Sequence, residues 1–162
     1  MKSAEHTKQV TKKRPSCHTR YHRVPGKKLG HIFELKNKSY LITVDYYSNF
    51  WEVDKLPDTK ARTVILKLKN HFTRYGYPEK VVSDNGPQFS CNEFATFART
   101  WEFEHCTISH ENSKANGKVE SAVKTAKRLL RKALEAGTNP YLAILDYKTR
   151  LHRESGQALL SA

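Results

Sequence analysis

The chain has 162 residues, which is enough for one hydrophobic core but short for two domains. Hydrophobic residues make up 38% and charged residues 28%, which excludes a wholly disordered chain and favours a folded domain. Lys and Arg outnumber Asp and Glu by 29 to 16, and the formal net charge of +13 predicts a surface that attracts phosphate backbones or anionic membranes. No stretch is long and apolar enough to span a membrane. The three widely spaced cysteines favour a reducing, intracellular compartment, nuclear or cytoplasmic, over a disulfide framework.

Residues 1–28 are the most basic part of the chain. They contain nine Lys and Arg but a single acidic residue, Glu5, and they show no apolar periodicity. We expect a flexible basic arm that contacts nucleic acid or serves nuclear import. A merely solvated terminus would have the same composition.

The segment from Leu29 onward has the periodicity of regular secondary structure. Apolar and polar residues first alternate, which predicts a β-hairpin with its turn at residues 36–38. Apolar residues recur at helical spacing after Asn116, and Gly137 stands where that helix should stop. The other predicted elements, in chain order, are a strand at 50–53, a helix at 59–76, a strand at 80–83, a helix at 92–101, a strand at 103–108, a polar loop at 109–115 and a last helix from Pro140.

The order of these elements predicts an α/β fold. Three strands joined by short turns should be antiparallel, and a strand that returns after a helix should lie parallel to a neighbour through a right-handed crossover. The result is a mixed five-stranded sheet flanked by helices, which is the ribonuclease-H-like architecture.

Two acidic residues are candidates for a metal site. Asp84 follows a predicted buried strand and Glu120 lies in the first turn of the predicted long helix, with 35 residues between them. Carboxylates held on rigid elements can bind hard cations such as Mg²⁺. Each acid also has an ordinary explanation, because Asp-Asn-Gly is a common turn sequence and a first-turn glutamate suits the helix dipole.

The sequences around both acids are more specific than the acids themselves. Residues 83–89 (SDNGPQF) and 116–120 (NGKVE) strongly resemble the retroviral and gypsy-type retrotransposon integrase core, including its spacing of 35 residues between the last two catalytic acids. Residues 44–48 (VDYYS) and 145–147 (LDY) resemble two further landmarks of that family. The resemblance covers residues 29–148.

This resemblance implies a ribonuclease-H-like core that processes the ends of a mobile element's DNA and joins them to target DNA with Mg²⁺ or Mn²⁺. Asp84 and Glu120 correspond to the second and third catalytic acids and therefore to metal ligands. The implied partner is DNA, and the family's oligomers imply a homodimer.

The predicted long helix adds a basic surface next to Glu120. Lys124, Lys127 and Arg131 recur at helical spacing on the same side as the acid, so phosphates bound there would lie beside the metal. A solvated basic helix face is the simpler alternative. The expected DNA-binding residues are Asn116, Gly117, Lys118, Lys124, Lys127, Arg128 and Arg131.

The first catalytic aspartate of the family is missing. The family has it in the first strand, in a Gly-x-Asp-aliphatic-Phe string, whereas residues 30–33 here read GHIF. Alignment on the phenylalanine puts His31 at the aspartate position, and alignment on the glycine puts Ile32 there. Glu34 should face the opposite side of the strand from His31. Asp45 could lie diagonal to His31 on one face if the hairpin is centred near residue 37.

We therefore expect an integrase-core domain at residues 29–150 with impaired catalysis, followed by a truncated tail at 151–162. One alternative is a non-catalytic nucleic-acid-binding module derived from an integrase. Another is an active nuclease or transferase in which Asp45 or another group completes the metal site.

Overall fold

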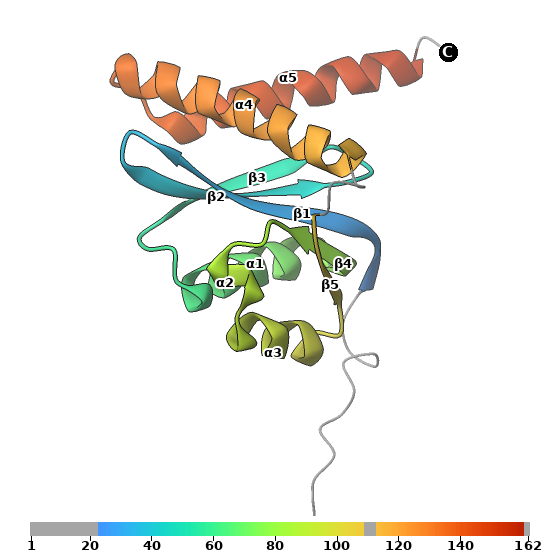
Figure 1. Ribbon diagram of the computed structural model, residues 1–162. Helices are drawn as coiled ribbons and strands as arrows, with labels where there is room; N and C mark the ends of the chain where they lie inside the picture. Colours follow the sequence, from blue (N-terminus) through green and yellow to red (C-terminus); the bar gives the residue numbers. More distant parts are fainter. Residues whose placement is uncertain (1–22, 109–112, 161–162) are drawn as a thin grey trace, which may run out of the picture.

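A computed structural model of the chain describes residues 23–108 and 113–160. Within these ranges, one five-stranded sheet has the strand order β3-β2-β1-β4-β5 (Figure 1). The strands are β1 (Arg23–Leu35), β2 (Lys38–Asp45), β3 (Trp51–Leu56), β4 (Tyr77–Ser83) and β5 (Glu104–Thr107). Because β1 pairs antiparallel with β2 and parallel with β4, the predicted mixed sheet is confirmed.

Helices cover both faces of this sheet (Figure 1). On one face lie α1 (Ala61–Tyr75), α2 (Pro87–Ser90) and α3 (Asn92–Thr100), and on the other lie α4 (Ser113–Glu135) and α5 (Pro140–Leu160). The short α2 was not predicted. Its first residue is Pro87, whose fixed φ suits the first position of a helix, so the proline begins a helix after the chain break. None of the described helices is both long and apolar enough to cross a bilayer.

Alternation along β1 divides the interior into two hydrophobic cores. Leu29 and Phe33 pack in the core under α4, together with Ala126 and Leu130 of that helix. Ile32 contacts the other core, which α1 and α3 fill with their apolar faces. Each fully buried side chain of this size contributes roughly 1.5–3 kcal/mol to folding. The sheet is therefore held rigidly between two helical layers. Side chains on its α4 face point toward the same core.

The β1–β2 hairpin turns through Lys36 and Asn37, which have φ angles of 49° and 57°. Two consecutive residues with positive φ form the tight turn whose twist matches that of the flanking strands. The turn pairs Leu35 with Lys38 and therefore His31 with Ile42. This register differs by one residue from a hairpin centred on Asn37, and a shift of one residue exchanges the two faces of a strand.

Several element boundaries differ from the sequence predictions. Residues 23–28, assigned to the basic arm, belong to β1, because their backbone pairs with β4 from Tyr77 onward although their side chains show no apolar alternation. The helix α4 begins at Ser113, inside the predicted polar loop. The helix α5 continues through the predicted tail to Leu160. Residues 1–22 of the arm lie outside the described residues.

A buried polar network joins α1 to the sheet. His71 is 1% exposed, and its Nδ1 lies 3.1 Å from the hydroxyl of Thr43 while its Nε2 lies 2.5 Å from Oδ2 of Asp54. Lys67 donates to the other oxygen of Asp54 at 3.2 Å. Burial alone would raise the pKa of Asp54, but the hydrogen bonds from His71 and Lys67 lower it below the usual range. The network satisfies polar groups that would otherwise be buried without partners.

Candidate active site

His31 lies in β1 on the face that α4 covers. Its strand neighbours Leu29 and Phe33 are buried in the α4-side core, whereas Ile32 packs into the core on the other face. Since side chains alternate along a strand, the structure brings His31 and not Ile32 to the candidate acids. The Nδ1 of His31 is 2.9 Å from Oδ2 of Asp84, which is an ion pair when the ring is protonated.

Asp84 directly follows β4 and is held in a tight turn. Its Oδ1 accepts a hydrogen bond from the Gly86 backbone amide at 3.1 Å. A Cβ at Gly86 would lie 2.3 Å from the amide nitrogen of the Gln88 side chain and 3.0 Å from Oδ1 of Asp84, so the end of the Gln88 side chain would have to move. The hydrogen bond from His31 lowers the pKa of Asp84, the Gly86 amide acts in the same direction, and burial opposes both. Asp84 is thus a turn residue whose second carboxylate oxygen contacts His31.

Ser83 and His105 form a hydrogen-bonded group next to the backbone of Asp84. The Ser83 hydroxyl is fully buried, donates to the Asp84 carbonyl at 2.9 Å and lies 2.9 Å from Nε2 of His105. Burial lowers the pKa of His105 and so favours its neutral ring. The contact between these two side chains was not predicted. Nothing in the chain pattern joins positions 83 and 105, which meet only because β5 pairs with β4.

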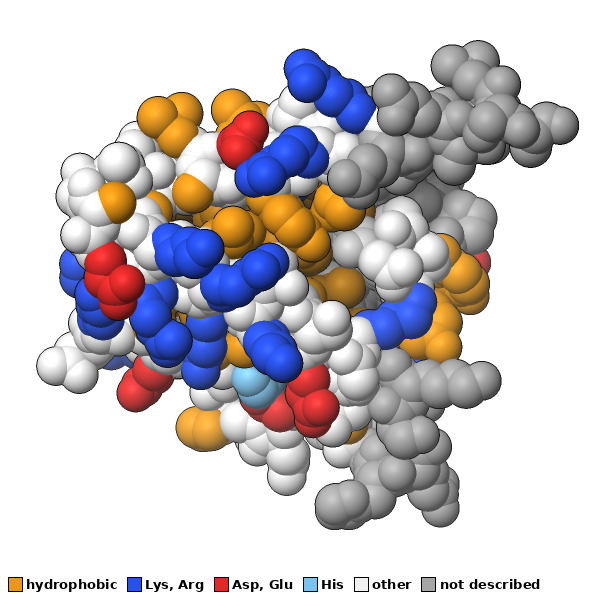
Figure 2. Space-filling view, turned by 90° about the horizontal axis from the view of Figure 1, so that it is seen from above, with side chains coloured by type: hydrophobic (Ala, Val, Ile, Leu, Met, Phe, Trp, Pro, Cys, Tyr) orange, Lys and Arg blue, Asp and Glu red, His pale blue; other side chains and the backbone are white. Residues whose placement is uncertain are grey.

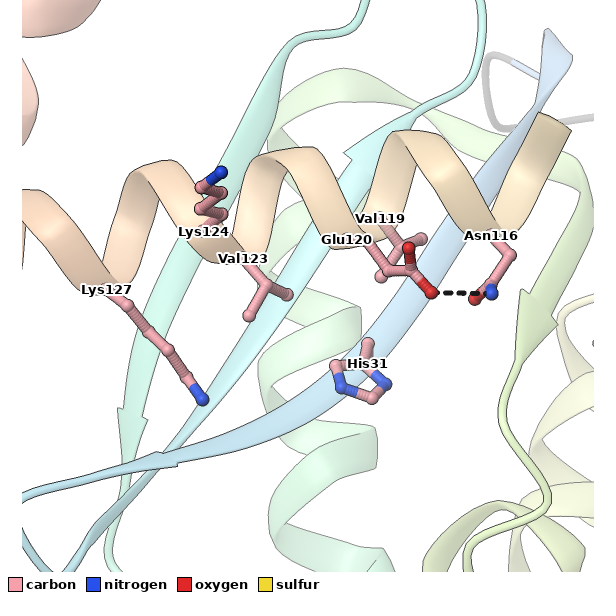
Figure 3. Close-up of a pocket in the computed structure, with 7 residues that line it drawn as sticks. All are labelled: His31, Asn116, Val119, Glu120, Val123, Lys124 and Lys127. Atoms are coloured by element: carbon pink, nitrogen blue, oxygen red, sulfur yellow. Dashed lines mark hydrogen bonds between the residues drawn. The ribbon is translucent and has the colours of Figure 1, made fainter. Parts of the chain in front are cut away.

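Glu120 lines a pocket of about 450 Å³ between α4 and β1. Figure 3 shows His31 beneath the helix, with Asn116, Glu120, Lys124 and Lys127 along the pocket. The carboxylate of Glu120 accepts a hydrogen bond from the Asn116 side-chain amide at 2.7 Å. Because α4 begins at Ser113, Glu120 does not lie in the first turn, and the helix dipole does not explain its position.

Asp45 lies on the opposite face of the sheet from His31. It pairs with Lys28 across the hairpin, and its carboxylate accepts hydrogen bonds from Lys28, the backbone amides of Tyr47 and Ser48, and the Ser48 hydroxyl. The expectation that Asp45 could share a face with His31 is therefore wrong, since the hairpin register is shifted by one residue. Glu34 also faces away from His31, as predicted.

The basic residues of α4 form one exposed surface. Figure 2 shows Lys and Arg side chains gathered on this side of the molecule, next to a histidine that is flanked by acidic side chains. Lys124, Arg128 and Arg131 are exposed, and Lys127 is half-buried with its ammonium 5.5 Å from the centre of the Phe33 ring. None of these four side chains forms an ion pair with a described carboxylate, so their charges face solvent and any bound anion.

Lys118 has a different environment from these four. Its Nζ donates to the Tyr46 carbonyl at 2.5 Å and to the Asn49 side chain at 2.8 Å, and it lies 4.5 Å from the centre of the Tyr46 ring. Lys118 therefore ties α4 to the loop between β2 and β3. Gly117 is exposed, and a Cβ there would have no atom within 4 Å.

The His31–Asp84 contact predicts an abnormal titration of Asp84. Its carboxyl should stay ionised to a lower pH than an ordinary aspartate, whose pKa is about 3.9. In the His31→Ala variant we expect the pKa of Asp84 to rise, because the largest stabilisation of the charged form is lost. Carboxyl-carbon NMR titration of both proteins measures this, and an unchanged midpoint would show that the contact does not form in solution.

Gly117 gives a second prediction. A glycine inside a helix costs about 0.5–1 kcal/mol relative to alanine, and the open space here predicts that Gly117→Ala stabilises the fold by that amount. Urea unfolding measures the change. The matched change Gly86→Ala lies outside a helix interior and should bring no such gain, because its Cβ would displace the end of the Gln88 side chain. A destabilised Gly117→Ala variant would mean that the fold itself needs this glycine.

Comparisons with known proteins agree with this geometry. The family model described as "Integrase core domain" matches residues 21–113. Over 98 residues the chain is 34% identical to uncharacterized protein K02A2.6 of Caenorhabditis elegans, covering 60% of this chain and 8% of that protein. It therefore spans less than a tenth of that relative.

Two solved structures share the fold. The catalytic core domain of BIV integrase has a TM-score of 0.65 at 20% identity, covering 73% of this chain and 77% of that one. The HTLV-2 integrase catalytic core domain in complex with magnesium has a TM-score of 0.60 at 24% identity, covering 75% of this chain and 80% of that one. These likenesses confirm the predicted ribonuclease-H-like architecture.

Proposed function

The chain belongs to the integrase core domain family, and on that premise we propose that it binds DNA through α4 while its metal-dependent end processing and strand transfer are impaired. The observation that carries this proposal is the 2.9 Å contact between His31 and Asp84 at the position where the family has its first catalytic aspartate. A retrotransposon is the origin that best suits the residues resembling gypsy-type integrases.

The donor set supports the impairment. A two-ion site for phosphodiester chemistry uses oxygen ligands to activate the attacking oxygen and to stabilise the leaving oxygen. His31 offers a ring nitrogen, which is a poor Mg²⁺ ligand, and that nitrogen already pairs with a carboxylate oxygen of Asp84. Among residues 23–108 and 113–160, no three His, Cys, Asp or Glu side chains gather as a metal cluster.

These residues therefore do not fit the two-ion site. Asp84 and Glu120 are the catalytic acids and metal ligands that this chain retains, and we assign them weak binding of Mg²⁺ or Mn²⁺. The magnesium in the HTLV-2 core shows what a related core holds. Since the described residues supply no third carboxylate here, we assign this site the role of receiving DNA rather than cutting it.

The DNA-binding part of the proposal rests on α4. Lys124, Lys127, Arg128 and Arg131 project from one helix without a described acidic partner, and the first two line the pocket beside Glu120. Cations in such a row neutralise successive phosphates independently of sequence, which makes affinity strongly dependent on salt. Asn116 and Gly117 lie at the start of this row, and the open space around Gly117 leaves room for a phosphate backbone. The ammonium group of Lys118 is hydrogen-bonded within the fold. Lys118 therefore contributes to DNA binding by positioning α4 and not by offering a free charge to a phosphate.

Two measurements test the proposal. Affinity for a duplex element-end oligonucleotide, measured by fluorescence anisotropy at several salt concentrations, should fall as salt rises. The Lys124→Ala/Lys127→Ala variant should reduce the slope of log affinity against log salt by about two. The control Lys55→Ala/Arg62→Ala removes the same charge from exposed positions on β3 and α1 and should leave the slope unchanged. Equal effects of both variants would contradict an interface on α4.

Cleavage of the same labelled oligonucleotide with Mg²⁺ or Mn²⁺ separates the catalytic alternatives. We expect little or no cleavage by the chain as it stands. Activity that Asp84→Asn abolishes would overturn the impairment and the reading as a non-catalytic binding module. Binding without cleavage would favour that module.

We also propose a homodimer as the solution state. The helix α5 leaves Tyr141, Leu142 and Leu145 more than half exposed, which is apolar surface that a second copy can cover. Sedimentation equilibrium should give twice the chain mass, and Leu142→Glu/Leu145→Glu should give a monomer. A monomeric wild-type chain at high concentration would remove this part of the proposal.

A further inference from the structure

The loop between β2 and β3, residues 46–50, carries the most exposed large hydrophobic side chain in the described part of the chain. Tyr47 is 73% exposed, whereas its neighbour Tyr46 packs against the α4-side core. Aromatic rings of this size are usually buried or meet a partner. The exposure of Tyr47 is therefore a feature that needs an explanation.

This loop is rigidly held. The carboxylate of Asp45 accepts hydrogen bonds from the backbone amides of Tyr47 at 3.1 Å and Ser48 at 2.8 Å, and from the Ser48 hydroxyl at 2.9 Å. The side chain of Asn49 accepts from Lys118 of α4 at 2.8 Å. Because hydrogen bonds fix the turn at both ends, the exposure of the Tyr47 ring is a property of the ordered loop and does not result from loop disorder.

Neighbouring residues orient the Tyr47 ring and leave it accessible. Two of its ring carbons would lie 3.8 and 4.0 Å from a Cβ at Gly26, so the ring rests beside the β1 backbone. Its centre is 5.4 Å from that of Tyr46 with an interplanar angle of 86°, an edge-to-face contact. An oriented ring loses little conformational entropy when a second planar group stacks on it.

Two lysines lie beside Tyr46, the neighbour of Tyr47 in this loop. The ammonium groups of Lys27 and Lys118 lie 4.9 and 4.5 Å from the centre of the Tyr46 ring. Lys28 lies 3.3 Å from Asp45, whose charge it offsets. Lys27 forms no ion pair with a described carboxylate. The loop therefore combines an exposed aromatic ring with excess positive charge, which suits an anionic partner that carries planar groups.

We propose that Tyr47 is a stacking platform for an unpaired base of the DNA that α4 binds, with Lys27 contacting the adjacent phosphate. Stacking on an aromatic side chain beside basic residues is the general mode by which proteins hold single strands. Lys27 precedes His31 by four residues in β1, about 13 Å along the strand, so one DNA strand can reach both. This inference rests on the proposed DNA binding.

Anisotropy with three oligonucleotides of equal length tests the platform: a single strand, the same strand with abasic sites, and a duplex. Tyr47→Ala should weaken single-strand binding by about tenfold while leaving duplex and abasic binding and the salt dependence unchanged. Tyr47→Phe keeps the ring and should bind as wild type. The control Leu66→Ala removes another exposed large hydrophobic side chain, 58% exposed, from α1 and should have no effect.

The outcomes separate this inference from the proposed function. Salt-dependent duplex binding with no effect of Tyr47→Ala on the single strand would overturn the platform alone and favour a protein partner for Tyr47. An equal loss for all three oligonucleotides would also overturn it, because the ring would then act through the fold. If the wild-type chain binds none of them, the proposed function fails as well. Urea unfolding of each variant checks that stability is unchanged.

Discussion

The His31→Asp variant is expected to bind Mg²⁺ at least about tenfold more tightly than the wild-type chain and to cleave an element-end oligonucleotide faster by on the order of 100-fold. The substitution removes the ring nitrogen that pairs with Asp84 at 2.9 Å and places a third carboxylate on the α4 face of β1. Clustered carboxylates repel one another, and divalent ions offset that repulsion. Isothermal titration calorimetry with Mg²⁺ measures binding independently of cleavage.

The matched control for this experiment is His31→Asn, which removes the imidazole without adding a charge. If the Asn variant gains as much affinity as the Asp variant, release of Asp84 from His31 is the cause and the third carboxylate is not. If neither variant gains affinity, His31 does not occupy the position of the missing ligand. The impairment would then have another origin.

The His71→Ala variant is expected to lose about 3 kcal/mol of stability, which lowers the midpoint of thermal unfolding by about 6–12 °C. The substitution leaves the buried hydroxyl of Thr43 and one oxygen of Asp54 without their partner and creates a cavity beneath the sheet. Urea unfolding should show a lower midpoint with an unchanged denaturant slope, because the surface exposed on unfolding hardly changes.

Lys67→Ala is the control for the buried network. It removes the other partner of Asp54, but its side chain is 29% exposed, and such an ion pair contributes about 1 kcal/mol or less. The stabilisation from Asp54 has a defined pH dependence. Since the folded pKa of Asp54 is lowered, this stabilisation is present above about pH 4 and is lost as pH falls through the folded pKa. Equal losses in both variants would contradict a network centred on His71.

Much of the fold could be predicted from the sequence because local periodicity determines it. The helices α1, α3 and α4 follow apolar residues at helical spacing, and the same buried positions, such as Leu68 and Leu130, fill the two cores. The segment at residues 23–28 could not be predicted this way. It is polar and basic, and only its backbone pairing with β4 makes it a strand.

The candidate site could likewise be predicted only in part. Asp84 and Glu120 were found because the strings around them are specific and because each is next to a predictable element. The contact between Ser83 and His105 had no signal in the sequence, since it depends on how β5 pairs with β4. The environment of Lys118 was also missed, because its partners lie 69 and 72 positions away in the chain.

The sequence by itself determined the order of the strands and of the long helices, the basic character of α4 and the choice of Asp84 and Glu120 as candidate site residues. Only the tertiary structure decided which side chains lie next to these two acids. A hairpin register that differs by one residue sends Asp45 to the far face, and the pairing of β1 with β4 leaves His31 against Asp84. The two-residue turn at Lys36 and Asn37 and the burial of Leu29 and Phe33 fix that register. Residues that are distant in sequence meet through such pairings, and periodicity along one segment carries no information about them.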